Sequence, residues 1–215
     1  MLLIKEYKIN GIKLSLCCLA VLLLTLIMFV PNKDVRDAAA LDEIIVSMVI
    51  AIYSSHIIFD DSNLEILLTG RIPFANIVFN RYFMYISMIL LLGALQYAMS
   101  LAFVPQYAFC VFASLIFATL VLSGISLVTA VISKSTGVST VVTVTVIGFM
   151  LGIQNPLKKH LMPEWLHYIN PYETTFFYGM KYWLQNRVIL FGIAVVAWIL
   201  SYALLRSRKF EYRKL

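Results

Sequence analysis

Long apolar runs alternate with short polar segments along the whole chain. Six runs lie at approximately 12–30, 38–59, 82–103, 107–132, 136–153 and 188–205. A helix needs about 20 apolar residues to cross the hydrocarbon core of a bilayer. The stretch from Tyr82 to Ser133 contains no Asp, Glu, Lys or Arg, and Pro105 indicates a tight turn within it. The pattern predicts an all-α membrane protein with six transmembrane helices, forming one domain over residues 1–215.

The composition supports a membrane protein and argues against nucleic-acid binding. Of the 215 residues, 61% are hydrophobic and 13% are charged, whereas a soluble domain averages about 45–50% apolar and about 25% charged. The net charge is +6, but the Lys and Arg residues gather beside the apolar runs, where they contact lipid headgroups. The three cysteines lie inside apolar runs, so we expect them to pack as small hydrophobes, with no metal site.

The distribution of positive charge predicts how the helices are oriented. With six spans, both termini lie on the same side of the membrane. If that side is the cytoplasm, the inner segments hold eleven Lys and Arg and the outer segments hold six. Because cytoplasmic loops carry an excess of positive charge, we expect N-in and C-in topology. Residues 60–81 are then cytoplasmic, and residues 154–187 form the longest outer segment.

The cytoplasmic segment 60–81 has the pattern of a short amphipathic helix followed by a break. Ser62 and Glu65 match a capping box at a helix start. Three leucines then share one helical face at spacings i, i+3 and i+4, namely Leu64, Leu67 and Leu68. Gly70 suits the end of that helix, and Pro73 suits the first turn of a second helix that continues into the membrane.

Two interpretations of this amphipathic helix are open from its residue types. It could lie on the membrane with its leucines in the lipid, or it could dock into a groove on a cytoplasmic partner. Helices that lie on membranes usually carry Lys and Arg on the polar face. Asp60, Asp61 and Glu65 are acidic instead, which favours docking.

The stretch "FDDSNLEILLTGRIPFANIVFNRY", Phe59 to Tyr82, resembles the segment after the second span in small type-2 ABC exporter permeases. The matching features are Asp60 and Asp61, Leu64–Leu68, Ile72 with Pro73, and Arg81 with Tyr82. The chain is most similar to permeases of exporters for amphipathic peptides, such as phenol-soluble modulins and antimicrobial peptides. It departs from many of these at "TGRIP", where they carry a Ser-Leu-Pro sequence.

This resemblance implies that the amphipathic helix is a coupling helix seated in a separate ATPase subunit. The implied contact residues are Asp60, Asp61, Leu64, Glu65, Leu67, Leu68 and Arg71. Two copies of the ATPase would bind ATP and Mg, while this chain would carry no cofactor. A second permease, identical or a sister chain, would complete the pathway in the bacterial cell membrane. The expected cargo is an amphipathic toxin-like or antimicrobial peptide, or a lipid-like drug.

The resemblance also implies that spans two and five line the path, and that short re-entrant helices precede span six. The candidate lining residues are Met48, Ile52, Tyr53, Thr140 and Thr143. The outer segment is rich in aromatic residues, which either form a headgroup belt or cover the exit. The principal candidates are Trp165, Tyr172, Phe176 and Trp183. Gly148 and Gly152 form a GxxxG pattern that favours close helix packing.

The motifs that are absent indicate that energy comes from outside the chain. The sequence has no GxxxxGK[ST] phosphate-binding loop, and it has no HExxH or GxSxG motif of an intramembrane protease. We identify His56, near the inner end of the second run, as the one ionisable group within the apolar runs, so an ion-coupled carrier is not expected. We predict no catalytic residue and no enzyme activity. The alternatives are a non-transporting accessory or immunity protein, or an intramembrane enzyme without a recognised motif.

Overall fold

The computed structural model describes residues 35–59, 74–103, 108–172 and 183–207, together with residues 16, 19, 20, 23 and 105. Its long helices are α3 (Val35–Phe59), α5 (Phe74–Phe103), α6 (Ala108–Ser133), α7 (Thr136–Gly152) and α10 (Trp183–Arg206). Two short helices, α8 (Gln154–Lys158) and α9 (Leu166–Ile169), lie between α7 and α10. This described part contains no strand, so the all-α prediction is confirmed there.

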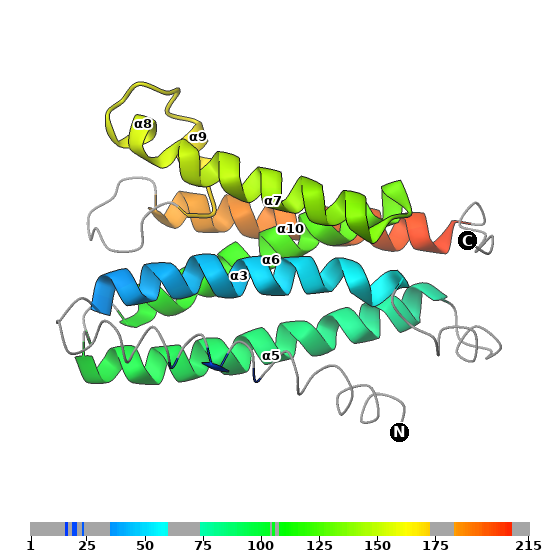
Figure 1. The fold of residues 1–215 in the computed structure, drawn as a ribbon, viewed down its shortest axis with the longest axis horizontal. Coiled ribbons are helices and arrows are strands. Elements are labelled where there is room, and N and C mark those ends of the chain that lie inside the picture. Colours follow the sequence, from blue (N-terminus) through cyan, green and yellow to red (C-terminus); the bar gives the residue numbers. More distant parts are fainter. Residues whose placement is uncertain are drawn as a thin grey trace.

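The five long helices lie side by side in a bundle, with α6 at its centre (Figure 1). Helix α6 packs against α3, α5, α7 and α10. Leu115, Leu122 and Leu127 on α6 are completely buried. A helix that is apolar all round is buried in the interior, and α6 has a mean hydropathy of 2.5 in its most apolar window. Hydropathy alone does not place α6 in the middle, because α10 has a mean hydropathy of 2.6 and exposes most of its surface; the contacts of α6 with four other helices do.

The outer helices instead expose apolar side chains, as expected for surfaces that face lipid. Leu91 on α5, Val141 on α7 and Val196 on α10 are all more than half exposed. Among the described residues, four helical stretches are long and apolar enough to span a membrane: Ala75–Ala102, Ala108–Ser133, Thr136–Leu157 and Trp183–Arg206. These helices are compatible with the predicted multi-pass membrane protein. Six spans and the N-in, C-in topology stay predictions, because most of 12–30 lies outside the described residues.

Local sequence signals explain where the helices begin and end. Helix α5 begins at Phe74, directly after Pro73, and continues without a break through the predicted third span. Helices α6 and α7 are joined by only two residues, of which Lys134 adopts the left-handed conformation with φ 54°. Ser135 then caps α7, because its Oγ accepts a hydrogen bond from the backbone N–H of Val138 at 3.4 Å.

Candidate functional site

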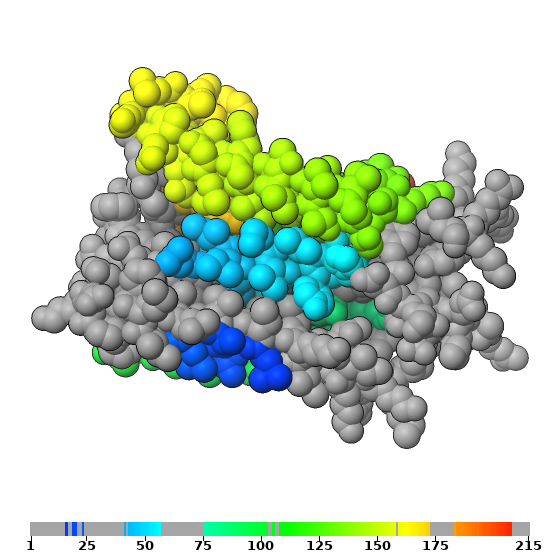
Figure 2. All heavy atoms as spheres, viewed as in Figure 1, coloured from blue at the N-terminus to red at the C-terminus, as the bar shows by residue number. Residues whose placement is uncertain are grey.

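Residues 154–172 form a hairpin that leaves the end of α7 and returns to the bundle before α10. The hairpin contains α8, an exposed tip, α9 and a stem at residues 170–172, and it stands out beyond the α7 surface (Figures 1 and 2). At its tip Leu161 is 74% exposed and Trp165 is 58% exposed. Its base has a small apolar core of Ile153, Leu157 and Leu166. We call this side of the molecule the hairpin end.

The stem returns into a buried group of polar side chains drawn from three helices and the stem itself. We call this group the stem cluster. Its members are Glu43 and Ser47 on α3, Ser114 on α6, Asn170 and Tyr172 on the stem, and Asn186 and Arg187 on α10. All of them are buried. Buried polar groups in a membrane protein carry a high energetic cost unless they are paired, so their partners are informative.

Arg187 is at the centre of the stem cluster, and its side chain is only 2% exposed. Its Nη1 donates a hydrogen bond to the carbonyl oxygen of Pro171 at 3.0 Å, and its Nη2 donates to Ser114 Oγ at 2.8 Å. Nη2 also lies 3.9 Å from Glu43 Oε1. The guanidinium carbon lies 5.7 Å from the centre of the Trp183 ring, within range of a cation–π interaction. One guanidinium therefore joins α10, α6, α3 and the stem.

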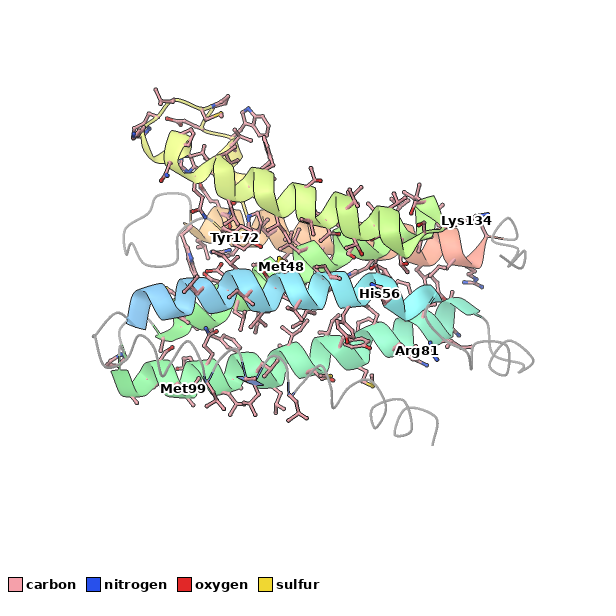
Figure 3. The ribbon with its side chains drawn as sticks, in the orientation of Figure 1. Met48, His56, Arg81, Met99, Lys134 and Tyr172 are labelled. Carbon is pink, nitrogen blue, oxygen red and sulfur yellow. The ribbon has the colours of Figure 1, made fainter. Side chains whose placement is uncertain are left out.

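Tyr172 makes the second contact between the stem and α3. Its hydroxyl lies 3.2 Å from Ser47 Oγ, and Figure 3 shows Tyr172 near Met48, the neighbour of Ser47 on α3. Burial raises the pKa of the Tyr172 hydroxyl well above its ordinary value of 10; the hydrogen bond with Ser47 lowers it, and the negative charge of Glu43 raises it. The hydroxyl therefore remains protonated at neutral pH, and it can either donate to Ser47 or accept from it.

Two amides fix the backbone of the stem. Asn186 Nδ2 donates to the carbonyl oxygens of His167 at 2.6 Å and of Asn170 at 2.9 Å. Gln154 Nε2 donates to the carbonyl oxygen of Tyr172 at 2.8 Å. The stem turns back on itself because Asn170 Oδ1 accepts from the backbone N–H of Tyr172 at 3.0 Å. These side chains supply the backbone partners that a helix or a sheet would otherwise provide.

A second buried polar group lies further along the bundle and ties together four helices. The Tyr82 hydroxyl on α5 lies 2.7 Å from Ser123 Oγ on α6 and accepts a hydrogen bond from Trp198 Nε1 on α10 at 2.8 Å. Ser54 on α3 donates to the carbonyl oxygen of Ser123 at 3.4 Å. This group links helices only to one another, whereas the stem cluster links helices to the hairpin.

The predicted path residues occupy different environments. Met48, Ile52 and Thr140 are half-buried, Tyr53 is 39% exposed and Thr143 is completely buried. Helices α3 and α7 pack directly against each other. A path that touches Thr143 would therefore require these helices to separate.

The remaining predicted residues fall into three groups. The coupling residues from Asp60 to Arg71, and also Phe176, lie outside the described residues. Trp165 is at the hairpin tip. Tyr172 is a member of the stem cluster, and the Trp183 ring lies beside Arg187. A Cβ atom added at Gly148 or Gly152 would have no neighbour within 4 Å in the described part. Close helix packing at these two glycines stays a prediction.

Glu43 and Arg187 are two buried residues that the sequence pattern does not single out. In the predicted topology Arg187 is one of the outer-segment cations, and His56 is the one ionisable group expected within the spans. The structure buries Glu43 and Arg187 and brings them together across 144 positions of sequence. A signal was available, because Glu43 lies inside the predicted span 38–59, and an ionisable residue within a span is functional by default.

No group of three or more His, Cys, Asp or Glu side chains that could hold a metal ion occurs among the described residues. The chain matches no protein family profile, no curated protein and no solved structure. Functional inference therefore rests on the residues themselves and on their arrangement.

Proposed function

We propose that this chain is the membrane permease subunit of a type-2 ABC exporter, driven by a separate ATPase subunit. The observation that carries the proposal is the stretch from Phe59 to Tyr82, with its two acids, leucine-rich face, Ile-Pro step and Arg-Tyr pair. The arrangement of the helices supports it. Helix α3 ends and α5 begins at the same end of the bundle, opposite the hairpin (Figure 1), so residues 60–73 connect two long helices there.

In this proposal the work is divided between two ends of the bundle. The segment 60–73 faces the cytoplasm and docks its leucine face on the ATPase. The hairpin faces outward and covers the exit. Two ATPase copies, each binding ATP and Mg, pair with two permeases in the bacterial cell membrane. The exposed Met and aromatic side chains, such as Met162 and Trp165 at the hairpin tip, suit an amphipathic peptide or lipid-like cargo, since such surfaces adapt to varied apolar groups.

The test is recovery of a partner ATPase from the native membrane. Tagged protein is purified in mild detergent, and every chain that accompanies it is identified. We expect an ATPase with a phosphate-binding loop to accompany the unmodified chain and to be lost from the Leu67→Arg variant, because a charge in the docking face cannot enter an apolar groove. Leu161→Arg is the matched control, since Leu161 is exposed at the opposite end.

The outcomes separate the candidate functions. An ATPase that is retained by Leu161→Arg and lost by Leu67→Arg supports the exporter and the coupling role together. An ATPase recovered equally with both variants removes the coupling role of Leu67. Reproducible recovery of this chain without any ATPase overturns the exporter proposal and favours an accessory membrane protein.

A further inference from the structure

Helix α3 connects the end of the bundle where the proposed function places the ATPase to the end where it places the exit of the cargo. It is an unbroken helix of 25 residues, which corresponds to about 37 Å at about 1.5 Å per residue. Its last residue, Phe59, leads into the proposed coupling segment, and Glu43 and Ser47 lie toward its other end, in the stem cluster. Helix α3 therefore offers a continuous path along which a displacement at one end can be carried to the other.

Two polar contacts attach the hairpin stem to α3. The first is the hydrogen bond between Ser47 Oγ and the Tyr172 hydroxyl at 3.2 Å. The second is a chain of contacts in which Glu43 pairs with Arg187 at 3.9 Å, and Arg187 donates to the carbonyl oxygen of Pro171 at 3.0 Å. Tyr172 thus contacts α3 directly, and Pro171 is linked to α3 through Arg187 of α10. Both are buried, so water does not compete for these contacts.

The attachment to α3 is polar, as are the hydrogen bonds by which Asn186 of α10 and Gln154 hold the stem. The hairpin base holds together by the apolar contacts of Ile153, Leu157 and Leu166, which have no directional requirement. The attachment to α3 depends on an ion pair and hydrogen bonds, which demand defined geometry and leave costly unpaired groups when broken. Such contacts favour one register of the stem against α3. When α3 shifts, these contacts move the stem with it, whereas apolar contacts alone would let α3 slide past the stem.

We propose that Glu43, Arg187 and Tyr172 are positioning residues that form a latch, through which α3 carries the motion of the coupling segment to the hairpin. This inference rests on the proposed exporter function. It assigns to α3 the link between the ATPase and the outer hairpin, and it assigns to the stem cluster the transfer of that motion. The hairpin follows α3 as one body as long as the latch is closed.

The first experiment measures the latch without any nucleotide. Amide hydrogen exchange is followed across residues 154–172 in the purified protein and in the Glu43→Gln and Tyr172→Phe variants. We expect exchange in the stem to accelerate by about tenfold or more, the factor that corresponds to about 1.4 kcal/mol of lost local stability. The matched controls are Glu164→Gln, an exposed acid on the hairpin, and Tyr202→Phe, which loses a 3.2 Å hydrogen bond to Asn76 away from the stem. Unchanged exchange in both latch variants overturns the proposal.

The second experiment asks whether the hairpin responds to the ATPase through the latch. Leu161→Cys, in a chain whose three native cysteines are replaced by alanine, carries an environment-sensitive fluorophore at the exposed tip. The assembled complex receives ATP, Mg and vanadate. We expect a fluorescence shift that is retained in Tyr202→Phe and largely lost in Glu43→Gln and Tyr172→Phe.

The two proposals fail in different ways in this experiment. A shift that persists undiminished in both latch variants overturns the latch and leaves the exporter intact. Absence of any ATPase overturns the exporter, and with it the transfer of motion through α3, whereas an ATPase that is present without any nucleotide response at the tip overturns the transfer of motion alone. The hydrogen-exchange result then still decides whether Glu43 and Tyr172 hold the stem.

Discussion

Replacing Arg187 by methionine is expected to be among the most destabilising single changes in the chain. Methionine keeps an unbranched side chain of moderate length but removes the charge and all of its donors. The contacts with Pro171 and Ser114, at 3.0 and 2.8 Å, are lost together. Hydrogen bonds from a charged group contribute about 1.5–3 kcal/mol each, so two of them give about 3–6 kcal/mol. Arg187→Met also removes the cation that faces the buried charge of Glu43, and such a loss costs about 3–5 kcal/mol. This second estimate for the destabilisation agrees with the first.

A double-mutant cycle separates the Glu43 contribution from the rest of this loss. Arg187→Met, Glu43→Gln and the double variant are unfolded reversibly in mixed detergent micelles, and circular dichroism gives the free energy of unfolding. Because Glu43→Gln removes the charge that Arg187→Met leaves uncompensated, the double variant should be more stable than the two single losses predict, by about 0.5–3 kcal/mol. Arg206→Met, at the exposed last residue of α10, is the matched control and should change stability by less than about 0.5 kcal/mol.

Additivity of the two single effects within about 0.5 kcal/mol would refute the reasoning, because it would show that Glu43 and Arg187 do not stabilise each other. An Arg187→Met variant as stable as Arg206→Met would refute it more completely, since it would mean that the buried hydrogen bonds of Arg187 contribute nothing.

Two further predictions concern the tyrosines. Tyr82→Phe loses the hydrogen bonds with Ser123 and Trp198 and should lower the free energy of unfolding by about 1–3 kcal/mol, measured by the same micelle unfolding, whereas an unchanged value would show that these bonds contribute nothing. For Tyr172 the folded-state pKa is raised, so above about pH 10 the unfolded chain releases this proton while the folded chain keeps it, and stability falls as pH rises. Thermal unfolding between pH 8 and 11 should show this decline, and the decline should be shallower in Tyr172→Phe. An equal decline in the unmodified protein and in the variant would show that the Tyr172 hydroxyl is exposed to water.

The sequence predicted the helix boundaries well where local signals mark them. Pro73 set the start of α5 because proline suits the first turn of a helix, and the structure begins α5 at Phe74. The apolar runs themselves located the described parts of the spans. Both predictions depend on short stretches of chain, so they needed no knowledge of how the helices pack.

The sequence could not predict which helix faces meet. Apolar residues surround α6 and α10 almost evenly, so the pattern does not reveal which face is inward. The side chains that meet in the stem cluster come from positions as distant as Ser47 and Tyr172. The hairpin stem also has few regular backbone bonds of its own, and its path depends on Asn186 and Gln154 in other segments. Only the assembled bundle brings these partners together.

The position of Arg187 on the last helix has a consequence for biosynthesis. Helices α6 and α7 are joined by two residues and share hydroxyl contacts through Ser126 and Ser139, so they can enter the membrane as a pair while the chain is still being made. Glu43 is synthesised early, but Arg187 arrives only with α10. Until then the carboxylate lacks this cation in a place where charge is costly. Closure of the stem cluster thus requires the insertion of α10, and a chain truncated before α10 would present to membrane quality control a carboxylate that the folded protein conceals.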